Sequence, residues 1–184
     1  MISTLKEYPN GGKIDVYDIV DQEASDFLKV FACCEYFAAQ GKYTLITPSF
    51  RGDTARNPIY MKIYASLMGT PYWTKCPDFL VDGVWYEHEG YDTNKDFSNP
   101  RTKNNTFFKM LALCAAHVIT RGIKQSARLI VEDCGVSRRE AKKNIYNRVH
   151  EYKQNIKEVY IRAVESLDLL YICADGSQSK KRAG

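Results

Sequence analysis

Apolar residues recur at helical spacing near the start of the chain, and this periodicity predicts the first helix. Between Asp21, a candidate N-cap, and Gly41, a candidate stop, the recurring positions are Phe27, Leu28, Phe31, Cys34 and Ala38. The β-branched and aromatic residues from Tyr43 to Thr47 predict a short strand. Asn57-Pro58 then combines an N-cap with proline at the first helical position, so a second helix is predicted to run to Gly69.

The dipeptide Asp82-Gly83 separates two strand-like runs and predicts a β-hairpin with a two-residue turn. This turn fixes the register of the two strands. The predicted opposite pairs are Val81 with Val84, Leu80 with Trp85, Phe79 with Tyr86, and Asp78 with Glu87. The last pair brings two carboxylates together, with Cβ atoms about 4.5 to 5.5 Å apart.

The second half of the chain alternates between polar and apolar segments. A long polar loop is predicted over residues 90–105, an apolar helix from Thr106 to Arg121, and a buried strand from Arg128 to Glu132. Ser137 and Glu140 form a capping-box pattern that opens a helix to about Tyr152. Two terminal strands, Glu158 to Ala163 and Asp168 to Cys173, are expected to form a hairpin.

These elements predict the α/β class, with a mixed central sheet and the order α-β-α-β-β-α-β-α-β-β. The 184 residues, of which 45% are apolar, suit a single α/β domain over residues 1–175, followed by a disordered basic tail at 176–184. The six cysteines form no CxxC pair, which indicates reduced thiols. No targeting or membrane-spanning segment is recognisable, so a cytoplasmic location and no membrane partner are expected.

Basic residues are concentrated toward the C-terminus. Residues 1–50 contain 4 basic and 7 acidic side chains, whereas residues 133–184 contain 11 basic and 7 acidic ones. Such asymmetry suits a polyanionic partner, and an ordinary solvated surface explains it equally well. The candidate phosphate-binding residues in loops are Arg51, Arg56, Lys95, Arg101 and Lys103, and those on the basic helix are Arg139, Lys142 and Lys143.

The hairpin is the strongest candidate for a chemical site. Strand alternation places Glu89 on the same face as Glu87, so Asp78, Glu87 and Glu89 would crowd together as metal ligands or acid-base groups. Convergent carboxylate oxygens suit Mg²⁺, which is the candidate cofactor. Lys124 would then stabilise the phosphate, and Gln125 would orient water or phosphate.

Each of these residues also has a structural interpretation. Carboxylates at strand ends often point into water, and Lys124 and Gln125 could simply be a solvated helix end. Packing against the sheet is the preferred role for Trp85, and a half-buried structural position is the preferred interpretation of His88.

The predicted order of elements, with Cys76-Pro77-Asp78 before the turn and Glu87-His88-Glu89 after it, resembles the core of PD-(D/E)xK nucleases. Glu89 occupies the position of the lysine in that motif, and the resemblance implies that Lys124 would replace it. Residues 122–131, together with the hairpin, the first helix and the first strand, also resemble the C-terminal tRNA-nuclease domains of contact-dependent growth-inhibition toxins. That class generally works without metal. The whole chain further resembles small proteins carried by bacterial mobile elements.

The leading functional prediction is a nuclease that cleaves phosphodiester bonds in RNA or DNA. The alternative is a non-catalytic, nucleic-acid-binding or accessory protein of a mobile element on a nuclease-like scaffold, which Glu89 in place of lysine favours. A small-molecule enzyme ranks last because the sequence has no glycine-rich phosphate loop, nucleophile elbow or zinc motif. The choice between RNA and DNA, the need for metal and the oligomeric state are left open.

Overall fold

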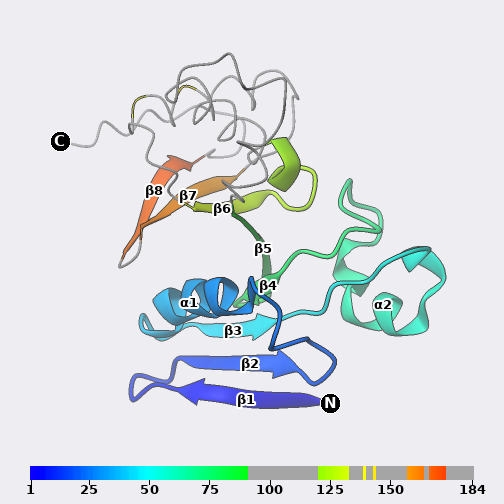
Figure 1. Ribbon diagram of the computed structural model, residues 1–184, viewed down its shortest axis with the longest axis horizontal. Helices are drawn as coiled ribbons and strands as arrows, with labels where there is room; N and C mark the ends of the chain where they lie inside the picture. The colour runs from blue at the N-terminus through cyan, green and yellow to red at the C-terminus, as the bar shows by residue number, and fades with distance from the viewer. Residues whose placement is uncertain (91–119, 133–138, 140–142, 144–156, 164–165, 173–184) are drawn as a thin grey trace. The chain divides into compact units, whose positions relative to one another are not determined.

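The computed structural model describes residues 1–90, 120–132, 139, 143, 157–163 and 166–172 (Figure 1). Its contacts divide the chain into two compact units, each described here by itself. The first unit comprises Met1–His88 with Lys124–Ser126, and the second comprises Glu89–Ile123 with Ala127–Gly184. The sequence prediction of one domain over residues 1–175 stays a prediction.

The first unit is built on a mixed β-sheet. Its strands, in spatial order, are β1 (Ile2–Glu7), β2 (Lys13–Tyr17), β3 (Tyr43–Ile46), β4 (Phe79–Val81) and β5 (Val84–Glu89). β2 and β3 are parallel, and the other neighbouring pairs from β1 to β5 are antiparallel. The predicted α/β class with a mixed sheet and a hairpin is therefore confirmed.

The predicted order of elements is wrong at its start, because β1 and β2 precede the first helix. β1 has five exposed positions among its six residues, so it lacks the apolar alternation that signals a half-buried strand. A turn through Pro9, Asn10 and Gly11 connects the two strands, and Gly11 has a φ of 85°. This turn is the sequence signal that could have revealed them.

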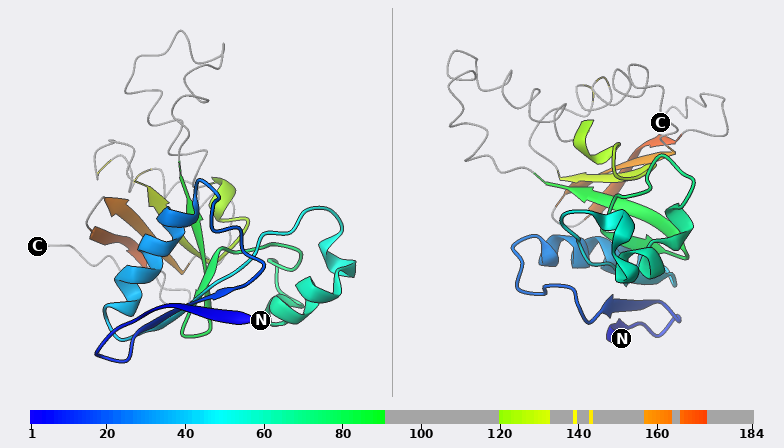
Figure 2. Two further views of the ribbon diagram at one scale, coloured as in Figure 1. Left: turned by 60° about the horizontal axis from the view of Figure 1, so that its bottom comes forward. Right: turned by 90° about the vertical axis from the view of Figure 1, so that its right-hand side faces the viewer.

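Helix α1 (Phe27–Ala38) packs along β2, β3 and β4, as the views in Figures 1 and 2 show. It begins at Phe27, later than predicted, because the Asp21 carboxylate instead accepts the Glu23 N–H (3.0 Å) in a preceding turn. Leu28, expected on the buried face, is 74% exposed. The face that packs on the sheet consists of Val30, Cys33, Cys34, Phe37 and Ala38.

The turn between β1 and β2 fits tightly against the end of α1. A Cβ atom on Gly12 would lie 1.8 Å from the Ala38 carbonyl oxygen, so glycine is required for this approach. Asn10 strengthens the contact, because its side-chain amide donates a hydrogen bond to the Ala39 carbonyl (2.8 Å). The first hairpin is therefore fixed to the helix as well as to the sheet.

Residues 48–77, here called the aromatic lobe, connect β3 to β4. The lobe contains the 3₁₀ turn η1 (Thr54–Arg56), helix α2 (Pro58–Ile63) and the 3₁₀ turn η2 (Ala65–Leu67). The predicted cap is confirmed, because the Asn57 side chain accepts the N–H groups of Ile59 (2.9 Å) and Tyr60 (3.2 Å). The predicted extension to Gly69 is wrong, since the backbone leaves the helical conformation at Tyr64 (φ −100°, ψ 19°).

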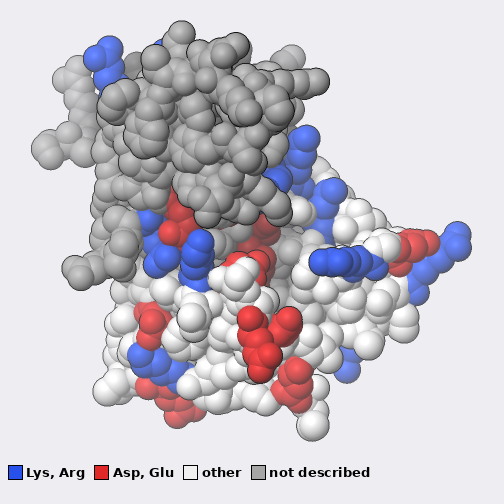
Figure 3. Space-filling view, in the orientation of Figure 1, with Lys and Arg blue, Asp and Glu red and all other residues white. Residues whose placement is uncertain are grey.

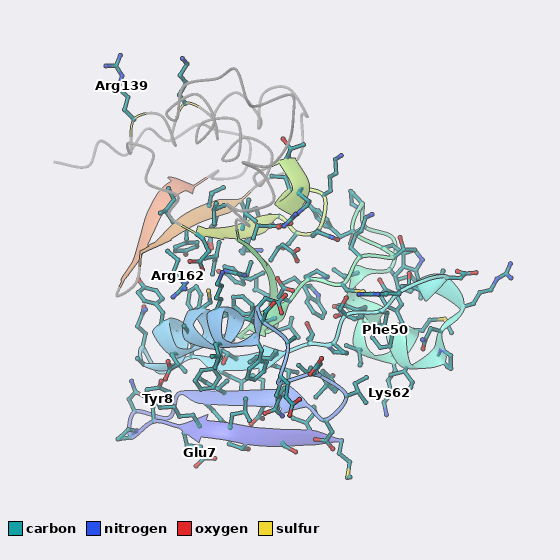
Figure 4. The ribbon with its side chains drawn as sticks, viewed as in Figure 1. Glu7, Tyr8, Phe50, Lys62, Arg139 and Arg162 are labelled. Atoms are coloured by element: carbon teal, nitrogen blue, oxygen red, sulfur yellow. The ribbon has the colours of Figure 1, made fainter. Side chains whose placement is uncertain are left out.

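Buried aromatic residues form the core of the aromatic lobe. Tyr60, Tyr64 and Leu67 are at most 4% exposed. The partly buried residues around them are Phe50, Ile63, Tyr72, Trp73, Cys76 and Trp85. The rings of Tyr60 and Tyr64 stack with centroids 4.8 Å apart, and Phe50 meets Tyr60 edge to face at 5.9 Å. Figure 4 labels Phe50 within this lobe.

The second unit contains β6 (Arg128–Glu132), β7 (Glu158–Ala163) and β8 (Ser166–Ile172). β6 pairs with β7 in parallel, and β7 pairs with β8 as the predicted antiparallel hairpin. The sequence predicted the bounds of β6 and β7 correctly, whereas β8 begins two residues before the predicted Asp168. Ion pairs link β6 to β7 at both ends, one between Arg128 and Glu158 (3.6 Å) and one between Arg162 and Glu132.

Several predicted elements lie outside the described residues. These are the loop after Gly90, the helix from Thr106 to Arg121 except for the helical residues 120–122, the helix after Ser137 except for residues 139 and 143, and the tail at 176–184. In the part of the chain that the structure describes, no helix is long and apolar enough to cross a membrane. Of the described cysteines, Cys33 and Cys34 are buried and Cys76 is half-buried.

Candidate functional site

The hairpin of β4 and β5 has the predicted turn and register. Asp82 and Gly83 have φ angles of 47° and 78°, and Phe79 lies opposite Tyr86 as expected. Positive φ at both central residues is the geometry of a type I′ turn, which suits tight hairpins. The Asp82 carboxylate accepts the Tyr43 N–H (3.0 Å) and pairs with the Lys42 ammonium (2.7 Å), so this turn is also tied to β3.

The two faces of the hairpin have different neighbours within the first unit. On one face, Phe79 and Tyr86 stack at 5.6 Å, and Phe37 of α1 lies 5.2 Å from Tyr86. On the other face, Trp85 stacks on Tyr64 of the aromatic lobe with centroids 4.9 Å apart. The predicted packing role of Trp85 is confirmed, and the lobe is thereby fixed to the face on which strand alternation places Glu87.

Asp78 and Glu87 are the next residues beyond the last described pair of the hairpin, Phe79 and Tyr86. The Asp78 carboxylate accepts the backbone N–H of His88 (2.8 Å), so it lies against the strand beside Glu87. Glu87 is 6% exposed. The predicted Cβ separation of the two carboxylates stays a prediction.

The Tyr64 phenol contacts the segment that leads into Asp78, because its hydroxyl lies 3.4 Å from the Pro77 carbonyl oxygen. Burial raises the pKa of Tyr64, a hydrogen bond with Thr47 opposes that rise, and the charges of Cys76, Asp78 and Glu87 add to it. The Tyr64 hydroxyl donates to the Pro48 carbonyl (2.6 Å), which fixes the phenol in place. Glu87 is therefore buried beside the lobe, and Asp78 is half-buried there.

The segment that leads into Asp78 is held by a network that the sequence did not reveal. The Thr47 hydroxyl donates to the Pro77 carbonyl (2.5 Å), and the Thr47 N–H donates to the Asp78 carbonyl (2.9 Å). The Tyr60 hydroxyl donates to the Lys75 carbonyl (2.8 Å). The spacing of Tyr60 and Tyr64, four residues apart on the predicted helix, is the signal that could have indicated a shared role.

Lys124 and Gln125 belong to the first unit. The neighbouring Ser126 hydroxyl donates to the Trp85 carbonyl (3.0 Å), so this segment lies beside the hairpin. Lys124 is exposed, and Gln125 is half-buried. The Gln125 Oε1 atom is buried and has no hydrogen-bond partner among the described residues. The predicted roles of both side chains stay predictions.

Glu89 lies in the second unit, where it pairs with a residue that the sequence analysis missed. The Arg121 guanidinium donates to Glu89 Oε2 from Nε (2.8 Å) and also from Nη2. Glu89 is 4% exposed, so this cation compensates a buried charge. Among the described residues, no group of three or more histidine, cysteine, aspartate or glutamate side chains is arranged to hold a metal ion.

The predicted phosphate-binding residues are only partly described. Arg51 and Arg56 are exposed on the aromatic lobe, where Arg56 Nε lies 3.2 Å from Asp53 Oδ2. Arg139 and Lys143 are exposed in the second unit. The remaining candidates, Lys95, Arg101, Lys103 and Lys142, lie outside the described residues.

The described elements define an α/β protein with two carboxylates, the buried Glu87 and the half-buried Asp78, at the end of a β-hairpin. No protein-family model and no curated protein matches the chain. Among solved structures, the chain is similar to a chain of the CdiA-CT/CdiI toxin and immunity complex from Burkholderia pseudomallei. The two are 13% identical, the match covers 83% of this chain and 90% of the other, and the TM-score is 0.38.

Proposed function

We propose that this protein is a nuclease-like domain that hydrolyses phosphodiester bonds in RNA or DNA. The observation that carries the proposal is the position of Asp78 and Glu87 at the end of a hairpin in a fixed register, where the Asp78 carboxylate accepts the His88 N–H and Glu87 is 6% exposed. Carboxylates held in a fixed position with little exposure to solvent are concentrated at functional sites. In phosphodiester hydrolysis, two such carboxylates can act as metal ligands or as acid-base groups.

The residues of the first unit fit a hard divalent cation such as Mg²⁺. Asp78 and Glu87 supply carboxylate oxygens, and the buried Gln125 Oε1 is a further acceptor on the segment beside the hairpin. Mg²⁺ is commonly held by one or two carboxylates, with water and substrate phosphates completing its coordination. When bound, the ion would supply charge stabilisation for the phosphate and lower the pKa of water.

Lys124 and Glu89 have different roles in this proposal. Lys124 is exposed and next to Gln125, so its ammonium can reach a phosphate at the surface of the first unit. Glu89, which the sequence analysis grouped with the metal ligands, is assigned instead to its ion pair with Arg121. The proposed acidic centre thus consists of Asp78 and Glu87.

Glu87→Gln tests the acidic centre. The variant should lose all cleavage of total RNA, plasmid and single-stranded DNA in Mg²⁺ or Mn²⁺, while its melting temperature is unchanged or slightly higher. The melting temperature should not fall, because removing one of two neighbouring negative charges relieves their repulsion. Cleavage should be lost, because the carboxylate is kept for function at the expense of stability. Asp78→Asn should behave alike. Glu7→Gln, at an exposed position of β1, is the matched control and should cleave like the wild type.

Lys124→Ala tests the phosphate-stabilising role. Turnover should fall while Mg²⁺ affinity, measured by calorimetry, is unchanged, because the ammonium acts on the phosphate and not on the ion. A loss of Mg²⁺ affinity in this variant would contradict that role.

The alternative function is a non-catalytic accessory protein that binds nucleic acid. It is favoured by one observation, namely that Glu89 stands where the nuclease motif has lysine and is engaged by Arg121. If the wild type cleaves nothing with any divalent ion and Glu87→Gln is only destabilised, the carboxylates are structural. The accessory function then replaces the nuclease.

A further inference from the structure

The aromatic lobe differs in charge from the chain that precedes it. Residues 1–47 contain four basic and seven acidic side chains, whereas residues 48–77 contain four basic and one acidic. The basic residues of the lobe are Arg51, Arg56, Lys62 and Lys75, and the acidic one is Asp53. Figure 3 shows blue side chains around the region that α2 occupies in Figure 1. Such a surface attracts a polyanion.

The aromatic lobe also exposes apolar side chains between these cations. Ile59, Met61 and Met68 are 50%, 39% and 61% exposed. Phe50, Tyr72 and Trp73 are partly buried around the Tyr60 and Tyr64 core, so that part of each ring is accessible. Lys62, labelled in Figure 4, lies on α2 next to Met61 and is exposed. A ligand that combines negative charge with flat apolar groups would match this surface.

The position of the aromatic lobe connects this surface to the acidic centre. The lobe ends at Pro77, directly before Asp78, and its Tyr64 stacks on Trp85, two residues before Glu87. A strand bound along the lobe would therefore pass close to both carboxylates. The rigid stacked core also means that the surface is formed before the ligand binds, which lowers the entropic cost of binding.

We infer that the aromatic lobe binds single-stranded nucleic acid, with the lobe cations on its phosphates and the exposed apolar and aromatic side chains against its bases. This inference rests on the proposed function only for the claim that the bound strand is a substrate. Unpaired bases are needed because a paired base offers its faces to its neighbours in the stack and not to a protein. Binding of this kind depends strongly on salt.

Tryptophan fluorescence provides a direct test, because both tryptophans of the chain, Trp73 and Trp85, pack on the core of the lobe. The wild type in EDTA is titrated with labelled oligothymidine and oligouridine of about 12 nucleotides, the size range of single-strand sites, and with a duplex of equal length. Single strands should bind tighter than the duplex and quench the fluorescence. Trp73→Phe should remove most of the quenching.

Charge removal gives the second readout. In Arg51→Ala/Lys62→Ala, the slope of log affinity against log salt should become shallower by roughly 1.4, or about 0.7 for each lost phosphate contact. Lys29→Ala/Lys157→Ala removes the same charge from α1 and from the residue before β7, and should bind like the wild type. Circular dichroism and melting temperature establish that both variants are folded.

Three results would overturn the inference: equal affinity for duplex and single strand without quenching, equal binding by the two double variants, or no binding at low salt. The last result would assign the exposed apolar residues to a protein partner. Because EDTA prevents metal-dependent cleavage, binding is measured separately from catalysis. Binding without any cleavage by the wild type would contradict the proposed function alone, and cleavage without a contribution from the lobe would contradict the inference alone.

Discussion

At the scale of single residues, Asp82 combines a backbone requirement with an electrostatic one. Its positive φ suits aspartate or asparagine in a type I′ turn, and its carboxylate pairs with Lys42. The hydrogen bond to Lys42 lowers the pKa of Asp82, and the Tyr43 N–H acts in the same direction. A folded-state pKa below the unfolded value means that the interaction stabilises the protein above the unfolded pKa. It is lost as the pH falls through the folded pKa.

Asp82→Asn isolates the ion pair, because asparagine keeps the turn conformation and an oxygen for the Tyr43 N–H. The side chains of Lys42 and Asp82 are 52% and 44% exposed, so the loss should be about 0.2 to 1 kcal/mol near neutral pH. The difference from the wild type should disappear in strong acid, where the carboxyl of Asp82 is protonated. Denaturant unfolding across the acid range measures it, and a difference that is constant with pH would contradict this role.

At the scale of elements, the segment before Asp78 carries backbone strain. Thr74 has a φ of 75°, a conformation that a β-branched residue rarely adopts, while its carbonyl accepts the Thr54 hydroxyl (3.3 Å). Left-handed geometry costs a residue other than glycine about 1 to 2 kcal/mol. The hydrogen bonds from Thr54, Tyr60 and Thr47 to residues 74–77 maintain the segment against this cost.

Thr74→Gly should therefore stabilise the protein. Relief of strain outweighs the extra freedom of glycine in the unfolded chain, about 0.5 to 1 kcal/mol, and the net gain should raise the melting temperature by roughly 1 to 4 °C. Thr4→Gly in β1, where φ is not positive, should lower it. If both variants melt below the wild type, the strain at Thr74 is not a significant cost.

The elements also show what local sequence could predict. The hairpin register followed from Asp82-Gly83 because a two-residue turn fixes every pair beyond it, and β6 followed from its uninterrupted apolar run. The end of α2 could not be predicted, because Tyr64 leaves the helix where its ring packs on Trp85 and its hydroxyl meets Pro48. These contacts join parts of the chain that are distant in sequence.

At the scale of the whole molecule, the predicted group of three carboxylates is divided between the two compact units. Asp78 and Glu87 belong to the first, and Glu89 belongs to the second. Strand alternation predicted the first two as neighbours in the hairpin. It could not predict Arg121, which is 32 residues from Glu89 in sequence and reaches it only through tertiary folding. The charge of Glu89 is thus explained by a partner that no local pattern indicates.

The ion pair between Arg121 and Glu89 predicts different behaviour for Glu87→Gln and Glu89→Gln. Glu87→Gln should lose Mg²⁺ affinity, whereas Glu89→Gln should keep it and be less stable, because the charged hydrogen bonds to Arg121 are weakened.

Arg121→Gln should lower the free energy of unfolding by about 1 to 3 kcal/mol, since it leaves the buried Glu89 carboxylate without its guanidinium donors. The double variant should cost less than the sum of the single variants, because both remove the same interaction. Calorimetric Mg²⁺ titration and denaturant unfolding of the wild type and of these four variants measure these effects. Loss of Mg²⁺ affinity in Glu89→Gln would return Glu89 to the metal ligands and contradict its assignment to the ion pair.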